Sequence, residues 1–268
     1  MTSERDVRPR PHVVRRGTGV PLVMVHGNGV DHRLLLELDE VFAAPGRWER
    51  IYVDLPGFGR SPALEGRGGL TDLADWLDAW VGETVGETPF AVVGNSMGGL
   101  LAADLAARRA GQCLGLALLA PVVVAQHDRR RRARAQVRED PQLLASLDPA
   151  DAVEYAAVAI DQTRQGWEAF RRAVLPGLRA GDPEAGRRLA AAYALPMPSP
   201  GDLDLPVLVV TGRQDAIVGV DDQWDWARGL PRGSTASLDR AGHNVHLDRP
   251  EVVAALLADW ARQVHPAG

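Results

Sequence analysis

The sequence lacks the features that mark disulfide-rich, metal-binding, membrane-spanning and secreted proteins. Among its 268 residues there is a single cysteine, Cys113, so no internal disulfide can form and no Cys/His cluster offers a metal site. No apolar run approaches the roughly 18 residues that a membrane-spanning helix needs. The first twelve residues are charged and contain no apolar core of a secretory signal. We therefore expect a cytoplasmic protein that carries no metal.

Lysine is also missing. All 30 basic residues are arginine, and 35 acidic residues outnumber them, which gives a net charge of −5. This balance argues against nucleic acid or an anionic membrane as the main partner. The hydrophobic fraction of 46% and the charged fraction of 24% are ordinary for a globular protein. A chain of this length fits one α/β domain with an insertion, or two small domains.

The most informative stretch is PFAVVGNSMGGLLAADLAARRA, residues 89–110. Residues 90–93 are a short apolar run with β-branched members, which predicts a buried strand. The alanine- and leucine-rich segment that follows favours a helix. Between them, Gly-Asn-Ser-Met-Gly places Ser96 in a strand–turn–helix unit, the layout of a nucleophile elbow. Glycines at positions 94 and 98 would let strand and helix meet around a strained serine.

Apolar runs and helical segments alternate along the first half of the chain, and the alternation resumes near residue 206. This order predicts an α/β fold with a parallel sheet covered by helices on both faces. We expect strands at residues 12–16, 21–25, 50–53, 90–93, 114–120, 206–211 and 234–238, the first of them at an edge. We expect the main helices of this part at residues 31–42, 70–81 with Thr71 as N-cap, and 250–264.

Residues 122–204 interrupt this pattern with alanine- and arginine-rich segments separated by proline and glycine. We interpret them as a helical lid inserted into a core formed by residues 1–121 and 205–268. The arginine run at residues 129–132 is interpreted as a solvated helix face, with acidic residues nearby. The helices of the lid are expected at residues 151–164, 166–174 and 183–193.

Three residues suited to nucleophilic catalysis come just after the expected ends of three different strands: Ser96, Asp215 and His243. Reactive groups of open α/β sheets gather at the carboxyl ends of the strands, so we expect these side chains to meet. His243 would accept the proton of Ser96 and later give it to the leaving group. Asp215 would fix the tautomer of the imidazole and stabilise its charged form. His246 and His265 are competing candidates for the base.

The turn His26-Gly27-Asn28-Gly29 follows another strand. A glycine-rich turn there could aim the Asn28 N–H at a developing oxyanion, beside the N–H of Met97 at the start of the helix. His26 is expected to make buried hydrogen bonds that shape the turn rather than to act in catalysis. Asp54 is expected to cap the tight turn of DLPGFGRS, residues 54–61, whose glycines do not form a dinucleotide fingerprint.

Together these motifs resemble the α/β-hydrolase superfamily, from about residue 12 to 264. The resemblance rests on HGNG at residues 26–29, DLPGFGRS at 54–61, GNSMGG at 94–99, GRQD at 212–215 and GH at 242–243. It implies an eight-stranded, mostly parallel sheet with a helical lid inserted after strand six, and a catalytic triad of Ser96, Asp215 and His243. It also implies that no cofactor is needed.

The resemblance narrows the reaction without naming the substrate. Serine at position 96 disfavours the subfamilies that use an aspartate nucleophile. The elbow is similar to that of C–C hydrolases that cleave aromatic ring-fission products, whose lid supplies an arginine, here Arg164, Arg171 or Arg172. Asn244 follows His243 where those enzymes typically have tryptophan, and the tail resembles small-molecule carboxylesterases and lactonases.

We therefore expect hydrolysis of a carboxylic ester or lactone through an acyl-Ser96 intermediate. The first alternative is C–C hydrolysis of a vinylogous 1,5-diketone. Further alternatives are thioesterase, amidase or peroxidase-like activity, or a ligand-binding homologue with an inert triad. The partner is expected to be a small molecule in a mostly apolar pocket between lid and sheet. Position along the chain suggests as lining residues Val30, His32, Tyr155, Trp167, Met197 and Val218.

Overall fold

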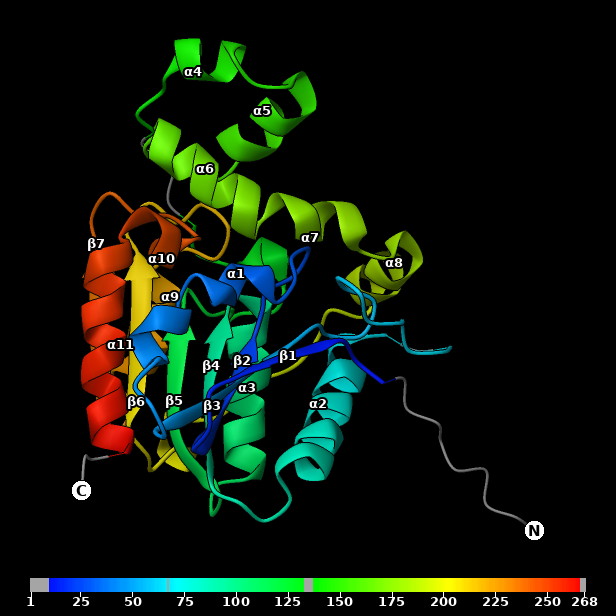
Figure 1. Ribbon diagram of the computed structural model, residues 1–268, viewed down its shortest axis with the longest axis vertical. Coiled ribbons are helices and arrows are strands. Elements are labelled where there is room, and N and C mark those ends of the chain that lie inside the picture. The colour runs from blue at the N-terminus through cyan, green and yellow to red at the C-terminus, as the bar shows by residue number, and fades with distance from the viewer. Residues whose placement is uncertain (1–9, 67, 133–136, 266–268) are drawn as a thin grey trace.

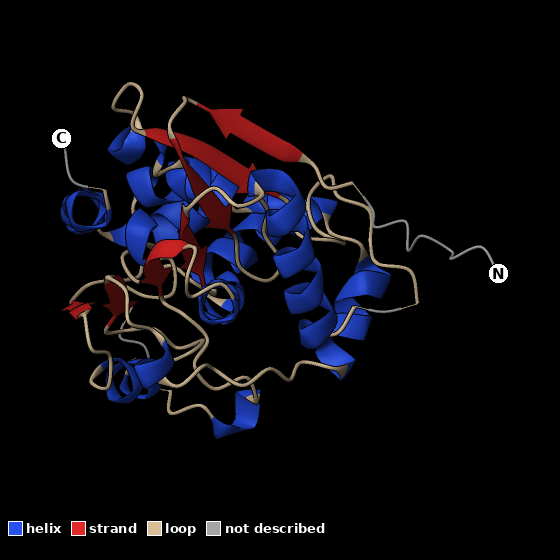
Figure 2. Ribbon diagram, turned by 90° about the horizontal axis from the view of Figure 1, so that it is seen from below, coloured by secondary structure: helices blue, strands red, loops and turns tan. Residues whose placement is uncertain are grey.

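The computed structural model describes residues 10–66, 68–132 and 137–265. A seven-stranded sheet forms the centre of the molecule, and helices cover both of its faces (Figure 1, Figure 2). The helices between the fifth and sixth strands lie together beyond the end of the sheet toward which its central strands point (Figure 1). Any group at the carboxyl ends of these strands therefore faces this helical segment.

All seven strands expected from the sequence are present. They are β1 (Val13–Arg16), β2 (Val20–Val25), β3 (Trp48–Val53), β4 (Phe90–Asn95), β5 (Cys113–Leu119), β6 (Val207–Gly212) and β7 (Gly233–Leu238). Their order in the sheet is β1-β3-β2-β4-β5-β6-β7. Strand β1 pairs with β3 antiparallel at one edge, and the other pairs are parallel. The eight-stranded expectation is wrong for the described residues, whose sheet has seven strands.

The helices that cover the sheet are α2 (Leu70–Val85) and α3 (Met97–Arg108) on one face and α11 (Pro250–Val264) on the other, as the buried clusters show. Side chains alternate along each strand, so Val92 of β4 joins the layer under α2 and α3, whereas Val93 joins the layer under α11. Strand β4 is buried along its whole length. A strand covered on both faces needs apolar residues at successive positions, which explains the continuous apolar run that the sequence shows.

The single helix expected at residues 31–42 is in fact two short pieces, α1 (Arg33–Leu36) and the 3₁₀ turn η1 (Asp39–Phe42). The break places the Asp39 carboxylate in the interior. There it accepts hydrogen bonds from Arg50 Nε at 2.9 Å and from the Tyr52 hydroxyl at 2.7 Å. These two bonds to strand β3 outweigh the helical preference of the leucine-rich sequence.

Thr71 is not the N-cap of α2, contrary to expectation. The cap is Gly69, and the Asp72 carboxylate accepts hydrogen bonds from the N–H groups of Gly68 and Gly69. The Thr71 hydroxyl instead donates to the carbonyl of Ala194. An acidic side chain in the first turn satisfies the open amides and suits the helix dipole, so it takes over the role expected of threonine.

The helical segment between β5 and β6 follows the fifth strand, not the sixth. It contains α4 (Pro141–Ala145), α5 (Pro149–Ala156), α6 (Arg164–Ala173), α7 (Leu175–Ala180) and α8 (Pro183–Ala191). The helix expected at residues 151–164 already ends at Ala156. The Tyr155 hydroxyl contacts both the N–H and the carbonyl of Thr163, which folds the chain back, and Thr163 then caps α6. The expected helices at residues 166–174 and 183–193 correspond to α6 and α8.

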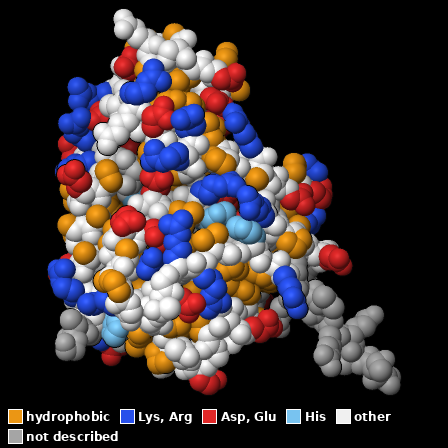
Figure 3. All heavy atoms as spheres, viewed as in Figure 1, with side chains coloured by type: hydrophobic (Ala, Val, Ile, Leu, Met, Phe, Trp, Pro, Cys, Tyr) orange, Lys and Arg blue, Asp and Glu red, His pale blue; other side chains and the backbone are white. Residues whose placement is uncertain are grey.

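The remaining elements are short. They are η2 (His127–Arg129), η3 (Pro200–Asp202), α9 (Asp221–Ala227) and α10 (Val245–Asp248). The arginine run at residues 129–132 does not form a helix face, because only Arg129 is helical, and Arg131 pairs with Asp222 and Asp225. Acidic and basic side chains are interspersed on the face of the molecule that Figure 3 shows. Among the described residues, no helix has the length and apolar content to cross a membrane.

Candidate active site

Ser96 occupies a strained turn between β4 and α3. Its φ of 55° and ψ of −119° lie in a region that residues with side chains rarely adopt. The two glycines of the elbow are required by close contacts: a Cβ on Gly98 would lie 2.3 Å from the carbonyl oxygen of His26, and one on Gly94 would lie 2.3 Å from that of Gly98. The local sequence therefore enforces a geometry that presents the serine hydroxyl at the end of the sheet.

The structure brings Ser96, His243 and Asp215 together. His243 Nε2 lies 2.8 Å from Ser96 Oγ, and His243 Nδ1 lies 2.9 Å from Asp215 Oδ2. The Asp215 side chain is fully buried, whereas that of His243 is 14% exposed. An imidazole whose Nδ1–H donates to the carboxylate presents a basic Nε2 to the hydroxyl, and this is the arrangement that activates a serine.

The loops after β6 and β7 fix the positions of Asp215 and His243. The second carboxylate oxygen of Asp215 accepts hydrogen bonds from the N–H groups of Ile217 and Val218, at 2.8 and 3.0 Å. On the other loop, the N–H of Gly242 donates to Asp248 at 2.7 Å. The histidine and its carboxylate therefore meet in a preorganised arrangement.

The other two histidines proposed as bases lie elsewhere. His246 is buried and its Nε2 contacts the carbonyl of Leu34 at 3.2 Å; burial lowers its pKa to about 4. His265 lies near the end of α11, with its ring edge-on to Trp48. Neither histidine is among the residues that line the cavity at Ser96.

The two amides expected to bind an oxyanion lie next to the serine. Met97 is the first residue of α3, and Asn28 lines the same cavity as Ser96 and His243. Within the described residues, neither the Met97 N–H nor the Asn28 N–H donates a hydrogen bond to the protein. Open amides of this kind, one of them at a helix N-terminus, can accept a negatively charged oxygen.

His26 has the structural role expected of it. Its Nε2 accepts a hydrogen bond from the Leu55 N–H at 3.0 Å, and its Nδ1 donates to the carbonyl of Gly27 at 2.7 Å. The side chain is fully buried, and this burial lowers its pKa, so the ring is neutral. These bonds join the turn that carries Asn28 to the turn after β3.

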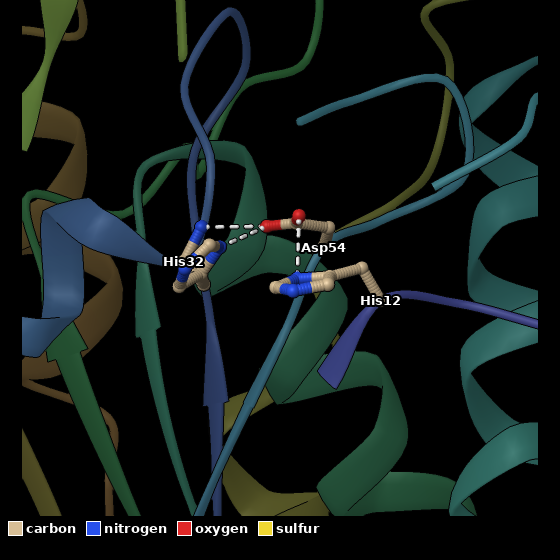
Figure 4. Close-up of side chains that lie close together, drawn as sticks. All are labelled: His12, His32 and Asp54. Carbon is tan, nitrogen blue, oxygen red and sulfur yellow. Dashed lines mark hydrogen bonds and ion pairs between the residues drawn. The ribbon is translucent and has the colours of Figure 1, made fainter. Parts of the chain in front are cut away.

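Asp54 caps its turn by accepting a hydrogen bond from the Arg60 N–H at 3.0 Å, as expected. It also accepts from the N–H and the Nδ1 of His32, at 2.8 and 2.7 Å, and pairs with His12 at 3.1 Å (Figure 4). Burial alone would raise the pKa of the Asp54 carboxyl, but the hydrogen bonds from His32 and Arg60 to its charged form outweigh burial and hold that pKa well below its usual range.

Two imidazoles and a carboxylate are ligands that zinc accepts, and the ligand atoms of His12, His32 and Asp54 all lie within 4.8 Å of one another. The sequence offered no sign of this cluster, because its members come from three separate segments. In Figure 4 both rings face the carboxylate. The hydrogen bonds and ion pair of Asp54 account for the arrangement by joining the segment before β1 to the loops after β2 and β3.

A cavity of about 730 Å³ opens at Ser96, His243 and Asn28. Small and apolar side chains form much of its wall: Val122, Ala125, Val158, Ala190, Ala191 and Ile217. Its polar side chains, apart from those of Ser96, His243 and Asn28, are Gln126, His127, Asp128, Arg130 and Tyr193. Most of the wall therefore comes from residues 122–194, the segment inserted between β5 and β6.

None of the six side chains expected to line the pocket does so. They pack elsewhere because the helices of the inserted segment form an apolar cluster of their own and rest on α1. That cluster contains Val30, Tyr155 and Trp167. Val218 belongs to the core under α2 and α3, Met197 packs against that core, and His32 contacts Asp54. Sequence reasoning missed Arg130 and Tyr193; the only available signal was that the arginine run follows the carboxyl end of β5.

Comparison with known proteins identifies the family of the chain. A sequence profile of the alpha/beta hydrolase fold family matches residues 20–250. The chain belongs to the alpha/beta hydrolase family. An Oenococcus oeni alpha/beta superfamily hydrolase of known structure shares the fold, with a TM-score of 0.85, 23% identity, and coverage of 95% of this chain and 99% of that one.

Two curated relatives of this α/β hydrolase extend over nearly its whole length. The (E)-2-((N-methylformamido)methylene)succinate hydrolase of Acinetobacter baylyi is 24% identical over 262 residues, which cover 93% of each chain. A pimeloyl-[acyl-carrier protein] methyl ester esterase of Neisseria meningitidis is 27% identical over 286 residues, which cover 98% of this chain and 100% of the relative. Together with the family match, these similarities identify the chain as an enzyme of the hydrolase class.

Proposed function

We propose that this hydrolase cleaves a small carboxylic ester or lactone through an acyl-Ser96 intermediate. The observation that carries the proposal is the hydrogen-bonded series from Ser96 Oγ through the His243 ring to Asp215, with both contacts shorter than 3 Å. A serine hydroxyl is a weak nucleophile until a base lies within such reach and a third group orients that base. The neighbouring open amides of Asn28 and Met97 support acyl transfer in particular.

In the first half of the reaction, Ser96 Oγ attacks the carbonyl carbon while His243 Nε2 takes the hydroxyl proton. The carbonyl oxygen becomes an oxyanion and accepts hydrogen bonds from the N–H groups of Asn28 and Met97. Asp215 stabilises the imidazolium through Nδ1–H. When the tetrahedral intermediate collapses, the bond to the leaving alkoxy group breaks, and His243 gives the proton to its oxygen.

In the second half, a water molecule takes the place of the alcohol beside His243. Nε2 removes a proton from this water, and the hydroxide attacks the acyl-Ser96 carbonyl with the same two amides at the oxyanion. Collapse of the second intermediate releases the carboxylic acid and returns the proton to Ser96 Oγ. A lactone follows the same path, except that the alcohol and the acid leave as one molecule.

The segment at residues 122–204 acts as a lid in this proposal. Val122, Ala125 and the alanines at 190–192 line the cavity at Ser96, which supports a role for the segment in choosing the acyl group. A mostly apolar wall suits a small organic substrate. The Neisseria relative is by name a methyl ester esterase, which also supports ester chemistry.

The C–C hydrolase alternative required an arginine of the lid at the substrate. Arg164, Arg171 and Arg172 each bond a side chain elsewhere, and none of them lines the cavity. Arg130, another arginine of residues 122–204, does line the cavity. C–C hydrolysis therefore stays the alternative that the substrate panel tests against the proposed ester or lactone hydrolysis.

The test is a substrate panel: p-nitrophenyl esters of graded acyl length, a series of lactones, and a vinylogous 1,5-diketone. We expect turnover of short or medium esters or of lactones, and its loss in the Ser96→Ala variant. Turnover of the diketone alone would replace our proposal with C–C hydrolysis. A well-folded protein that turns over no member of the panel would support a ligand-binding homologue instead.

A further inference from the structure

Arg130 is a cation in the wall of the catalytic cavity that has no acidic partner. Its guanidinium donates to three backbone carbonyls: Nε to Val124 at 2.9 Å, Nη2 to Ala125 at 3.0 Å and Nη1 to Ile217 at 3.3 Å. No carboxylate of the described residues lies within ion-pair distance of it. By contrast, the next residue in the run, Arg131, pairs with two aspartates.

The three carbonyls fix the position of the guanidinium without neutralising its charge. They come from the loop after β5 and the loop after β6, so the side chain bridges two walls of the cavity. The Arg130 guanidinium also lies over the Tyr193 ring, with its Cζ atom 5.9 Å from the ring centroid. Three of the five N–H groups donate to carbonyls, and the guanidinium also hydrogen-bonds the Tyr193 side chain.

A half-buried cation held in this way beside small apolar side chains is suited to bind an anion. An anionic group that enters the cavity gains a charge-assisted interaction with a guanidinium that is already oriented. The alanines at 190–192 and Val158 line the same cavity as Ser96 and Arg130, and offer apolar surface for a methylene chain.

We infer that Arg130 anchors a carboxylate at the end of the substrate remote from the scissile carbonyl. This inference rests on the proposed ester hydrolysis at Ser96 and deepens it: the substrate class becomes the monoesters of aliphatic dicarboxylic acids, or lactones that bear a carboxylate. Arg130 selects among substrates and takes no part in bond breaking.

Asp128 lines the same cavity and is exposed. Its negative charge repels an anionic substrate and therefore opposes the anchor. This pair of opposite charges allows a test in both directions, because removal of the arginine charge lowers the preference for anions and removal of the aspartate charge raises it.

The experiment compares matched esters that differ only in the terminal carboxylate, for example monomethyl adipate and methyl hexanoate, with shorter and longer pairs. The readout is the ratio of kcat/KM for the hemiester to kcat/KM for the neutral ester. We expect the native enzyme to favour the hemiester at one chain length by roughly 10- to 100-fold, the range that a charged hydrogen bond provides. Salt should reduce this ratio.

Variants assign the preference to Arg130. In Arg130→Gln the ratio should fall toward one, in Arg130→Lys it should be partly retained, and in Asp128→Asn it should rise a few-fold. Arg129→Gln is the matched control, because Arg129 is exposed, belongs to the same run and does not line the cavity. An effect on folding alone would lower both rates of Arg130→Gln together and leave the ratio unchanged.

Failure of this inference is distinguishable from failure of the proposed function. A native enzyme that hydrolyses neutral esters without preferring any hemiester, or an Arg130→Gln variant that keeps the preference, overturns the anchor and leaves ester hydrolysis standing. If no ester is turned over, calorimetric binding of the same pairs to the Ser96→Ala protein decides the anchor separately. Equal binding of the two members of each pair would overturn it.

Discussion

The Nε2 atom of His243 lies 2.8 Å from the Oγ atom of Ser96, although the two residues are 147 positions apart in the sequence. The parallel sheet closes this gap, because β4, β5, β6 and β7 are neighbours and their carboxyl ends share one edge. Each of the two residues lies just beyond one of these strand ends. The contact is thus a consequence of topology, and the strained turn at Ser96 is a consequence of the glycines around it.

The first prediction separates the strain at position 96 from its chemistry. Glycine adopts positive φ without strain, so the free energy of unfolding of Ser96→Gly should be about 1 kcal/mol higher than that of the native chain. The variant should have no activity, because it lacks the hydroxyl. Ser96→Ala should be equally inactive, with a loss of about 10³-fold or more, yet gain no such stability. Chemical denaturation and p-nitrophenyl ester assays measure both quantities. Equal stability of the two variants would contradict the account of the turn.

The second prediction concerns the close approach of α3 to the loop after β2. A methyl group on Gly98 would lie 2.3 Å from backbone carbonyl oxygens, so Gly98→Ala should destabilise the fold by about 3 kcal/mol or more and abolish activity. Gly186→Ala is the control, since it lies inside helix α8 with open space around it and should stabilise by up to about 1 kcal/mol. Thermal and urea unfolding give both values.

The third prediction concerns pH. Burial raises the pKa of the Asp248 carboxyl to about 6. Between roughly pH 4 and 6 the folded state therefore holds a proton that the unfolded state has released, so this group makes the fold less stable as pH rises through that window. Asp248→Asn should remove this effect while still accepting a hydrogen bond from Gly242.

The measurement is the difference in unfolding free energy between Asp248→Asn and the native chain. It should be small near pH 4, grow in favour of the variant to about 2 kcal/mol by pH 6.5, and then level off. His246 has the opposite effect in the same window, because burial lowers its pKa to about 4, but it is present in both proteins and cancels in the difference. A difference that does not depend on pH would contradict the raised pKa.

The fourth prediction distinguishes packing from substrate contact. Trp167 is buried among the aromatic rings of the inserted helices and does not line the cavity, so Trp167→Phe should lower stability by about 1–2 kcal/mol and leave the acyl-length preference unchanged. Ala191 does line the cavity. Ala191→Phe should therefore reject longer acyl chains at little cost in stability. A reversed pattern in the p-nitrophenyl ester series would mean that the cavity is not the acyl site.

Much of this architecture can be predicted from the sequence. The continuous apolar run before Gly94 predicts a strand that is buried on both faces. The local pattern also predicts that strands end just before Ser96, Asp215 and His243. Their convergence could be predicted because a parallel sheet places these ends at one edge. Helix α11 has the expected bounds, because its apolar residues recur with helical spacing and a proline marks its start.

The errors in the helices have a common physical cause: a specific side-chain hydrogen bond outweighed the intrinsic preference of the segment. Thr71 lost the capping role to Asp72, and the Tyr155–Thr163 contact ended a helix that propensity favours. The cavity could not be predicted, because its wall depends on how the inserted helices turn back over the sheet. Arg130 therefore looked like part of a solvated run, although it bonds carbonyls of two loops at the site.

The most direct test of the central claim is covalent labelling with a fluorophosphonate, followed by intact mass and peptide mapping. We predict one adduct per chain, located on Ser96, with slower labelling in His243→Ala and none in Ser96→Ala. A folded native chain that acquires no adduct, or a Ser96→Ala variant that is labelled as fast as the native chain, would contradict the assignment of Ser96 as the nucleophile.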